Sequence, residues 1–191
     1  MRHMPGGVSL VLGGAASGKS RFAEQLVRAS GGEKVYLATA QGRDDEMCAK
    51  IAHHRAARGT DWRTQECPLQ VGHAIAALGA GQIMLLDCAS MWLANHQLAG
   101  SDIHAETAAL LRALQHCRGS VVVVSNEVGA SVVPDNAVAR AFRNHQGRLN
   151  QQLAASSQRV VLVVAGLPWV LNNWQRQASG WCWWWRGCPG C

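Results

Sequence analysis

The sequence lacks the long apolar run that a membrane-spanning helix requires. Such a helix takes about 18–20 consecutive apolar residues, and no stretch of these 191 residues approaches that length. A secretory signal peptide is also missing, because a glycine-rich run beginning at Gly13 occupies the place where its cleavage region would lie. The sequence therefore predicts a soluble protein with no membrane span.

Clusters of like charge are missing as well. A formal net charge of +6 and a pI near 9.2 would suit a nucleic-acid-binding protein. However, the basic residues are scattered, with no block of about five or six like charges. A phosphorylated small-molecule ligand accounts for them equally well.

The cysteine spacing lacks the pattern of a disulfide framework. Cys48, Cys67, Cys88 and Cys117 lie singly within helix-like or strand-like segments. At such positions a cysteine usually behaves as a small buried apolar residue. We therefore expect a reducing, cytoplasmic environment.

Apolar runs rich in β-branched residues recur along the chain and alternate with segments of helical spacing. The expected strands are 8–12, 35–39, 83–87, 121–125 and 160–165, and the expected helices follow Ser20, run from 103 to 114 and run from 137 to 155. This alternation predicts an α/β fold with a mainly parallel sheet and helices on both faces. Ligands of such folds bind at the carboxyl ends of the strands.

The most informative motif is a phosphate-binding loop directly after the first expected strand. Glycine-rich backbone can turn its N–H groups around a polyphosphate, and the following helix directs its positive N-terminal end at the same anion. Lys19 would reach the β- and γ-phosphates, and the Ser20 hydroxyl would bind Mg²⁺. An ordinary glycine/serine turn would need neither this lysine nor this spacing. The loop consists of Gly13, Gly14, Ala15, Ala16, Ser17, Gly18, Lys19 and Ser20.

The sequence divides into a domain and an atypical tail. We expect residues 1–170 to form one nucleotide-binding catalytic domain, since a domain typically has about 100–200 residues. Residues 171–191 hold five of the eight tryptophans and three of the seven cysteines. We interpret this segment as a divergent, non-functional tail. The alternatives are a membrane-interface or partner patch, or a metal or redox site at Cys188 and Cys191, for which a lone CxxC is weak evidence.

Asp87 ends a strand of the Walker B form, in which four apolar residues precede an acid. Its carboxylate would bind Mg²⁺ directly or through water. Any strand can end in aspartate, so the pattern gains weight from the phosphate-binding loop upstream. Glu66 is a lone acid, for which the sequence predicts a solvated surface position.

The helix-like segment 44–58 carries two adjacent histidines. Its spacing places His54 on the same side as two apolar residues, whereas His53 points elsewhere. From spacing alone, a structural core or boundary histidine is favoured. The alternative is a nucleophile, because Arg55 and Arg58 are suited to binding phosphate oxygens beside it.

The segment Ser-Asn-Glu-Val-Gly at 125–129 follows an expected strand and opens beside the phosphate-binding loop. It leads into a helix that carries Arg140, Arg143 and Arg148. A substrate-facing loop and an ordinary turn before a solvated basic helix are both compatible with this pattern.

Together these motifs resemble the bifunctional adenosylcobinamide kinase/adenosylcobinamide-phosphate guanylyltransferase family of cobalamin biosynthesis. The resemblance covers roughly residues 8–168. It rests on the ordered set GGAASGKS, DDEM with the following HHR, WRTQE, LLDC, SNEVG and GRLNQQLA. It implies a P-loop fold related to RecA, often assembled as a trimer.

The resemblance also implies two reactions at one nucleotide site. ATP or GTP phosphorylates adenosylcobinamide; a histidine then attacks the α-phosphorus of GTP, expels pyrophosphate and passes GMP to the phosphorylated corrinoid. In the family this histidine directly precedes Arg or Lys, so it is His54 here, which replaces the structural interpretation. Lys19 would assist catalysis. The implied nucleotide contacts are Gly13–Ser20, Ala38, Thr39, Ala40, Arg55, Ala56, Ala57, Arg58, Glu66 and Asp87, with Ser20 and Asp87 also binding Mg²⁺.

Two departures from the family pattern stand out. The expected Phe-Arg-Asp is Phe142-Arg143-Asn144 here, which removes a carboxylate, and the chain beyond Pro168 follows no pattern of the family. The alternatives to the bifunctional enzyme are a P-loop small-molecule kinase with a structural His54 and a regulatory or nucleic-acid-binding ATPase module. Outside the tail, the sequence lacks the interleaved aromatic and basic residues of nucleic-acid stacking platforms, so we expect no nucleic-acid partner.

Overall fold

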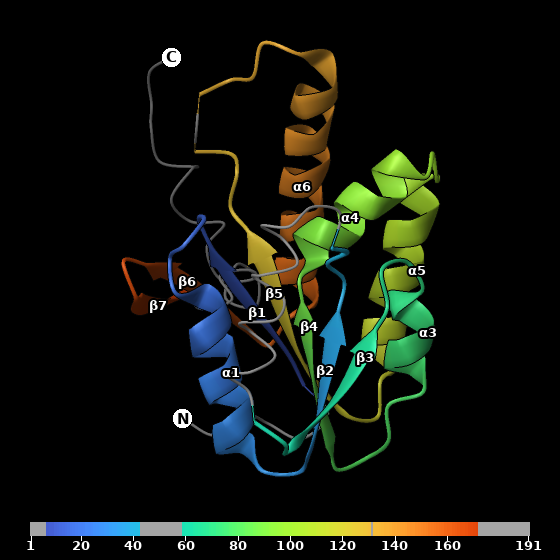
Figure 1. Ribbon diagram of the computed structural model, residues 1–191, viewed down its shortest axis with the longest axis vertical. Coiled ribbons are helices and arrows are strands. Elements are labelled where there is room, and N and C mark those ends of the chain that lie inside the picture. Colours follow the sequence, from blue (N-terminus) through green and yellow to red (C-terminus); the bar gives the residue numbers. More distant parts are fainter. Residues whose placement is uncertain (1–6, 43–58, 131, 172–191) are drawn as a thin grey trace, which may run out of the picture.

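The computed structural model describes residues 7–42, 59–130 and 132–171 (Figure 1). Their strands form one 7-stranded sheet in the order β3-β2-β4-β5-β1-β6-β7. Neighbouring strands pair in parallel, except that β7 is antiparallel to β6. The strands are β1 (Val8–Gly13), β2 (Glu33–Ala38), β3 (Trp62–Glu66), β4 (Gln82–Asp87), β5 (Ser120–Asn126), β6 (Arg159–Val164) and β7 (Leu167–Leu171).

Helices cover both faces of this sheet. One face packs against α1, and the opposite face packs against α3, α4, α5 and α6 (Figure 1). Within the described ranges the helices are α1 (Lys19–Ser30), α3 (Val71–Ala76), α4 (Ala89–Leu98), α5 (Ile103–His116) and α6 (Ala137–Ser156). None of them combines the length and hydropathy needed to cross a bilayer.

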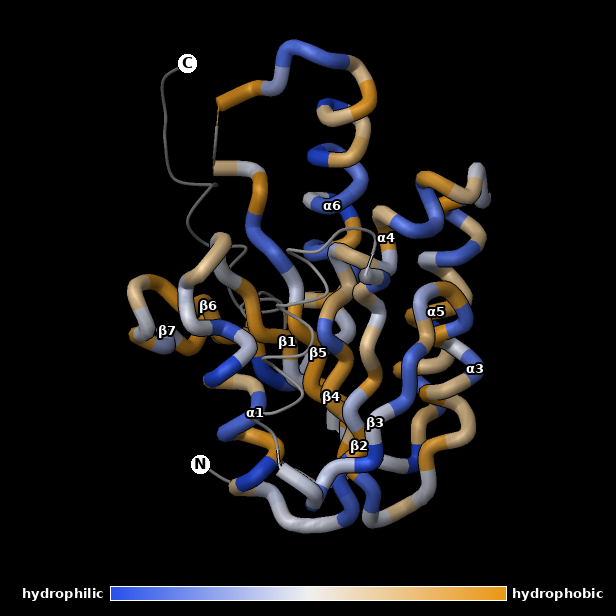
Figure 2. The backbone as a smooth tube through the Cα atoms, viewed as in Figure 1, coloured by the Kyte–Doolittle hydropathy of each residue, from blue (hydrophilic) through white to orange (hydrophobic). Residues whose placement is uncertain are grey.

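The central strands are continuous apolar runs because both of their faces are buried. Successive residues of a strand point to opposite faces, so Leu10 of β1 joins the cluster beneath α3–α6, whereas Val11 joins the cluster beneath α1. Figure 2 shows the resulting hydrophobic centre of the sheet between more hydrophilic helices. This double burial holds β1, and the loop that follows it, in the middle of the molecule.

The predicted α/β class and all five predicted strands are confirmed. The sequence analysis did not predict β3, β7, α3 or α4. Both unpredicted strands lie at the two sides of the sheet and are largely exposed. Strand β3 is polar after Trp62, and β7 is apolar but contains Pro168, which argues against a strand in the sequence. The short α3, of 6 residues, offers too few turns for a helical period to be recognised.

Candidate nucleotide-binding site

The phosphate loop, residues 13–20, joins β1 to α1 at the carboxyl edge of the sheet (Figure 1). Its strand lies between β5 and β6. Helix α1 begins at Lys19, and its N-cap is Gly18, which has no side chain to bond the first-turn N–H groups. Those N–H groups therefore face the loop as potential donors to an anion.

Two glycines of the phosphate loop are required by close packing against the end of β6. Gly18 has a φ of 89°, and a Cβ there would lie 3.3 Å from the Cα of Gly166. A Cβ at Gly13 would lie 2.7 Å from the carbonyl oxygen of Val163. The N–H of Gly166 also donates to the Ser17 carbonyl oxygen at 2.9 Å. The β6–β7 turn therefore fixes the backbone of the loop.

Lys19 and Ser17 supply the polar groups expected of a phosphate site. The Lys19 Nζ atom donates to the carbonyl oxygen of Gly14 at 3.1 Å, which keeps the ammonium over the loop. Among the described residues, Ser17 Oγ is buried and has no hydrogen-bond partner. A buried hydroxyl without a partner is rare in proteins, and this one lies inside the predicted phosphate loop.

Three predicted residues lie in one row across the neighbouring strands. Ala38, at the end of β2, pairs with Glu66 on one side and with Asp87 on the other. Glu66 is exposed, as the sequence predicted. Its place in the row brings it to the carboxyl ends of the strands, where Asp87 also lies. The sequence context of Glu66 alone did not indicate this position.

Buried hydrogen bonds fix Asp87 and the backbone around it. Tyr36 donates from its hydroxyl to Asp87 Oδ2 at 3.0 Å. The Thr39 hydroxyl donates to the Cys88 carbonyl oxygen at 2.7 Å and accepts from the Cys88 N–H at 2.8 Å. Asn95 Nδ2 donates to the Thr39 carbonyl oxygen at 2.9 Å. The hydroxyl of Thr39, a predicted nucleotide contact, is therefore used to join the ends of β2 and β4.

The sequence analysis missed Tyr36. The available signal was a tyrosine between the apolar residues Val35 and Leu37, because a buried phenol hydroxyl usually requires a hydrogen-bond partner. Here that partner is the carboxylate predicted to bind Mg²⁺.

The described cysteines behave as apolar residues. Cys67, Cys88 and Cys117 are free thiols. Burial, with a smaller contribution from the neighbouring Asp87, raises the pKa of the Cys88 thiol to about 11. The thiol is therefore neutral at physiological pH, as expected of a structural cysteine.

The predicted position of the Ser-Asn-Glu-Val-Gly segment is confirmed. Strand β5 pairs with β1 so that Asn126 lies opposite Gly13. The N–H of Glu127 donates to the Gly13 carbonyl oxygen at 3.0 Å. Asn144, where the family pattern has an acid, lies exposed on α6.

The structure brings the phosphate loop, residues 38–40, Glu66 and Asp87 to one edge of the sheet. Five predicted site residues lie outside the described residues: His54, Arg55, Ala56, Ala57 and Arg58.

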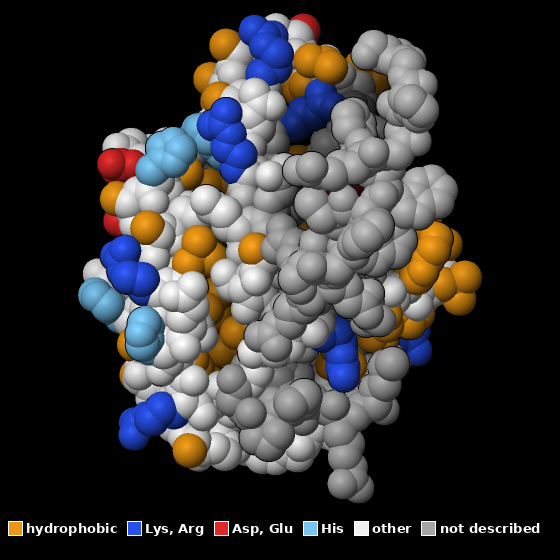
Figure 3. Space-filling model, turned by 180° about the vertical axis from the view of Figure 1, so that it is seen from behind, with side chains coloured by type: hydrophobic (Ala, Val, Ile, Leu, Met, Phe, Trp, Pro, Cys, Tyr) orange, Lys and Arg blue, Asp and Glu red, His pale blue; other side chains and the backbone are white. Residues whose placement is uncertain are grey.

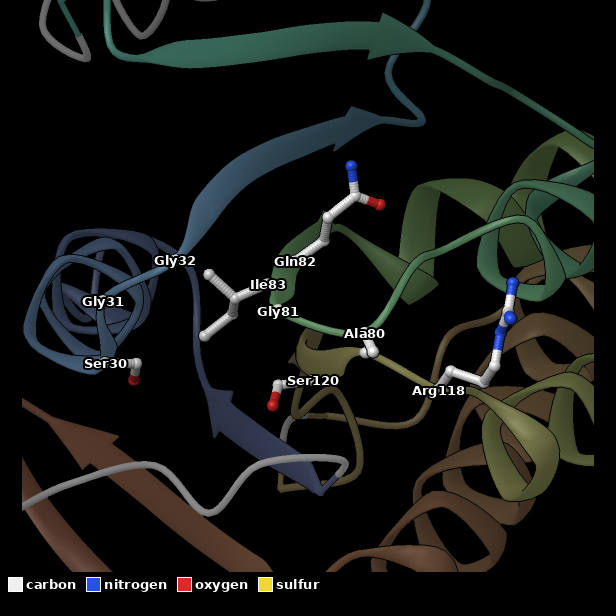
Figure 4. Close-up of a pocket in the computed structure, with 10 residues that line it drawn as sticks. Ser30, Gly31, Gly32, Ala80, Gly81, Gln82, Ile83, Arg118 and Ser120 are labelled. Atoms are coloured by element: carbon white, nitrogen blue, oxygen red, sulfur yellow. The ribbon is translucent and has the colours of Figure 1, made fainter.

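A cavity of about 390 Å³ lies at the opposite, amino-terminal ends of the strands (Figure 4). It is lined mainly by the turns that contain Gly31, Gly32, Gly81 and Gly119. Figure 4 shows the side chain of Arg118 extending away from these turns. The sheet separates this cavity from the phosphate loop, so we assign it no part in nucleotide binding.

Comparison with known proteins identifies close relatives over nearly the whole described chain. Residues 9–171 match the family described as cobinamide kinase / cobinamide phosphate guanyltransferase. The chain is 43% identical over 167 residues to the bifunctional adenosylcobalamin biosynthesis protein CobP of Pseudomonas aeruginosa, covering 86% of this chain and 96% of that protein. It is 41% identical over 174 residues to the corresponding CobU protein of Escherichia coli K12, covering 83% and 96%.

Solved structures with low sequence identity share the fold. A prototypical ATPase from the type III secretion system of pathogenic bacteria matches with a TM-score of 0.55 and 9% identity, covering 90% of this chain and 58% of that one. Protein PH0250 of Pyrococcus horikoshii OT3 matches with a TM-score of 0.53 and 9% identity, covering 88% and 87%. The predicted α/β fold with a mainly parallel sheet and helices on both faces is therefore confirmed. The match over residues 9–171 and the identity to CobP and CobU confirm the resemblance as well: the chain belongs to the cobinamide kinase / cobinamide phosphate guanyltransferase family.

Proposed function

We propose that this chain phosphorylates adenosylcobinamide with ATP or GTP, and then transfers GMP from GTP to adenosylcobinamide phosphate to give adenosylcobinamide-GDP. The observation that carries the proposal is a complete phosphate loop at the centre of the sheet, in a chain that belongs to this family over residues 9–171. Both reactions would use one triphosphate site.

In the kinase step, Lys19 would neutralise charge on the β- and γ-phosphates. Ser20, on the first turn of α1, and Asp87, at the end of β4, would hold Mg²⁺, which prefers hard oxygen donors of this kind. When bound, the ion would neutralise charge that develops on the phosphates. Tyr36 supports this role of Asp87 because its hydroxyl orients the carboxylate.

In the guanylyl-transfer step, His54 would act as the nucleophile. A neutral imidazole nitrogen attacks the α-phosphorus of GTP; the new N–P bond forms as the α–β bridging P–O bond breaks and pyrophosphate leaves. A phosphate oxygen of adenosylcobinamide phosphate then attacks the same phosphorus and releases the histidine. Arg55 and Arg58 would bind phosphate oxygens, and residues 38–40 with Glu66 would contact the guanosine.

A labelling experiment tests the covalent step. Wild-type protein is incubated with Mg²⁺ and GTP labelled in the guanine, and bound label is measured by mass spectrometry and acid treatment. We expect an acid-labile GMP adduct that is retained in His53→Ala and abolished in His54→Ala. An intact, folded wild-type protein that forms no adduct would overturn the proposal.

We also propose a cytoplasmic, homo-oligomeric enzyme, a trimer by family resemblance, with residues 1–170 as its catalytic domain and 171–191 as a tail outside it. The free thiols Cys67, Cys88 and Cys117 support a reducing compartment.

Leu167 and Trp169, exposed on the edge strand β7, support self-association. Membership of the family supports a small-molecule corrinoid partner over nucleic acid. Figure 3 shows several basic side chains close together at the top of the molecule and others spread below them.

A further inference from the structure

Four buried polar side chains form a network beneath the carboxyl end of β5. They are Ser90 of α4, Ser125 of β5, and Gln146 and Asn150 of α6. Ser125 donates to Asn150 Oδ1 at 2.7 Å, and Gln146 Nε2 donates to Ser125 Oγ and to Asn150 Oδ1, both at 2.9 Å. Among the described residues, Gln146 Oε1 is the atom of this network that is buried without a partner. The bonds that are formed join α6 to β5, and because buried polar groups are costly unless paired, they favour a single arrangement of these elements.

The network holds the backbone of Asn126 on both sides. Ser90 Oγ accepts the Asn126 N–H at 2.8 Å, and Asn150 Nδ2 donates to the Asn126 carbonyl oxygen at 3.0 Å. The next residue, Glu127, donates its N–H to the carbonyl oxygen of Gly13 at 3.0 Å. Residues 126 and 127 are thereby fixed against the phosphate loop.

The side chain of Glu127 is held as well. Its Oε1 atom accepts the N–H of Gly129 at 2.6 Å, and the carbonyl oxygen of Gly129 accepts from the Arg143 guanidinium. The carboxylate is exposed. A fixed, accessible carboxylate beside the phosphate loop can contact a substrate bound at the end of the triphosphate.

The order of the strands distinguishes Glu127 from the other acids at this edge. Glu66 ends β3 at the far side of the sheet, and Asp87 ends β4, which β5 separates from β1. Asp87 also accepts from Tyr36 and is the candidate Mg²⁺ ligand. Within the described residues, Glu127 is the acid at the end of a strand that pairs directly with the phosphate-loop strand.

We propose that Glu127 is the general base of the kinase step and that Ser90 and Asn150 are positioning residues for it. This inference rests on the proposed function. The acceptor oxygen of the corrinoid hydroxyl forms a bond to the γ-phosphorus while the bond from the γ-phosphorus to the β–γ bridging oxygen breaks. The nucleoside diphosphate leaves, and the hydroxyl proton passes to Glu127 Oε2. A carboxylate that accepts the hydroxyl proton is a recurring requirement of phosphoryl transfer to alcohols.

The test compares both reactions in Glu127→Gln, whose amide oxygen can still accept the Gly129 N–H. With adenosylcobinamide and γ-labelled nucleotide, we expect kcat for phosphoryl transfer to fall about 100-fold, the lower end of general-base effects. Formation of the GMP adduct from GTP, and GMP transfer to supplied adenosylcobinamide phosphate, should be unchanged. Glu127→Asp should recover part of the kinase rate. Asp135→Asn, a matched change of the carboxylate that precedes the N-terminal end of α6, should leave both reactions unchanged.

The outcomes separate this inference from the proposed function. If wild-type protein phosphorylates adenosylcobinamide and Glu127→Gln does so equally fast, the inference is wrong and the proposed function stands. An equal loss of both reactions would also overturn it, because a base for the hydroxyl has no part in GMP adduct formation. If the wild-type protein transfers no phosphoryl group to adenosylcobinamide, the proposed function fails and the inference fails with it.

Discussion

The phosphate loop and the β5 loop, residues 126–129, lie at the ends of neighbouring strands, but different kinds of contact hold them. Backbone contacts hold the phosphate loop, with glycines where a side chain would not fit. Side chains of α4 and α6 hold the β5 loop, and they come from 36 and 24 residues away in the sequence. The conformation of the phosphate loop is therefore determined largely by its own sequence, whereas the position of Glu127 beside it depends on residues that are distant in the sequence.

The largest effect should come from removing the cation of the phosphate loop. In Lys19→Ala, we expect kinase turnover and GMP adduct formation both to fall by about 1,000-fold, because the charge that stabilises the triphosphate is lost. Steady-state rates and the adduct assay measure the two losses. Lys34→Ala is the matched control, since this lysine lies near the amino-terminal end of β2, opposite the end that carries the site, and pairs with Asp61 at 3.1 Å. A variant that kept either activity would show that the two reactions do not share the phosphate loop.

Substitutions of two glycines test whether close backbone packing holds the phosphate loop in place. Gly13→Ala should lower the free energy of unfolding by about 1–3 kcal/mol, because the new Cβ would meet the Val163 carbonyl oxygen. In Gly14→Ala, no atom of the described residues other than its chain neighbours lies within 4 Å of the new Cβ. This control should therefore unfold like the wild type in urea without nucleotide. Equal stabilities of the two variants would contradict the close packing of the loop against β6.

The same contrast explains how much the sequence could predict. The phosphate loop, the strand ending at Asp87 and the central strands are local patterns, and all were found at the expected positions. Strand β3 was missed because only Trp62 among its residues is buried. Its partnership with β2, which brings Glu66 into the row of Asp87, depends on a pairing between segments that are distant in the sequence.

The buried network escaped the sequence analysis for a related reason. Gln146 and Asn150 look like ordinary polar positions of a helix, and the only local signal is that they are one turn apart on the face that carries Leu149 and Leu153. Their burial arises only when α6 packs against α4 and β5. The role proposed for Glu127 could therefore not be derived from the SNEVG pattern alone.

The positioning role of the network predicts a smaller effect than the loss of Lys19. In Asn150→Ala, the Asn126 carbonyl oxygen loses its donor, so we expect the β5 loop to shift and kcat of the kinase step to fall about 10-fold, equivalent to about 1.4 kcal/mol. The KM for nucleotide and the yield of GMP adduct should stay at wild-type values, because the phosphate loop keeps its own backbone contacts.

Gln146→Ala is the control that separates positioning from stability. Gln146 belongs to the same network and is fully buried, but its side chain donates to Ser125 and Asn150, whereas Asn150 donates to Asn126. Both variants should lose stability, by about 1–3 kcal/mol, since each leaves buried polar groups unpaired. Only Asn150→Ala should lower kcat of the kinase step while leaving the yield of GMP adduct unchanged. An equal slowing of the kinase step by both variants, in proportion to their loss of stability, would contradict the positioning role. The network would then stabilise the fold only, and the contact with Gly13 would be what fixes the position of the β5 loop.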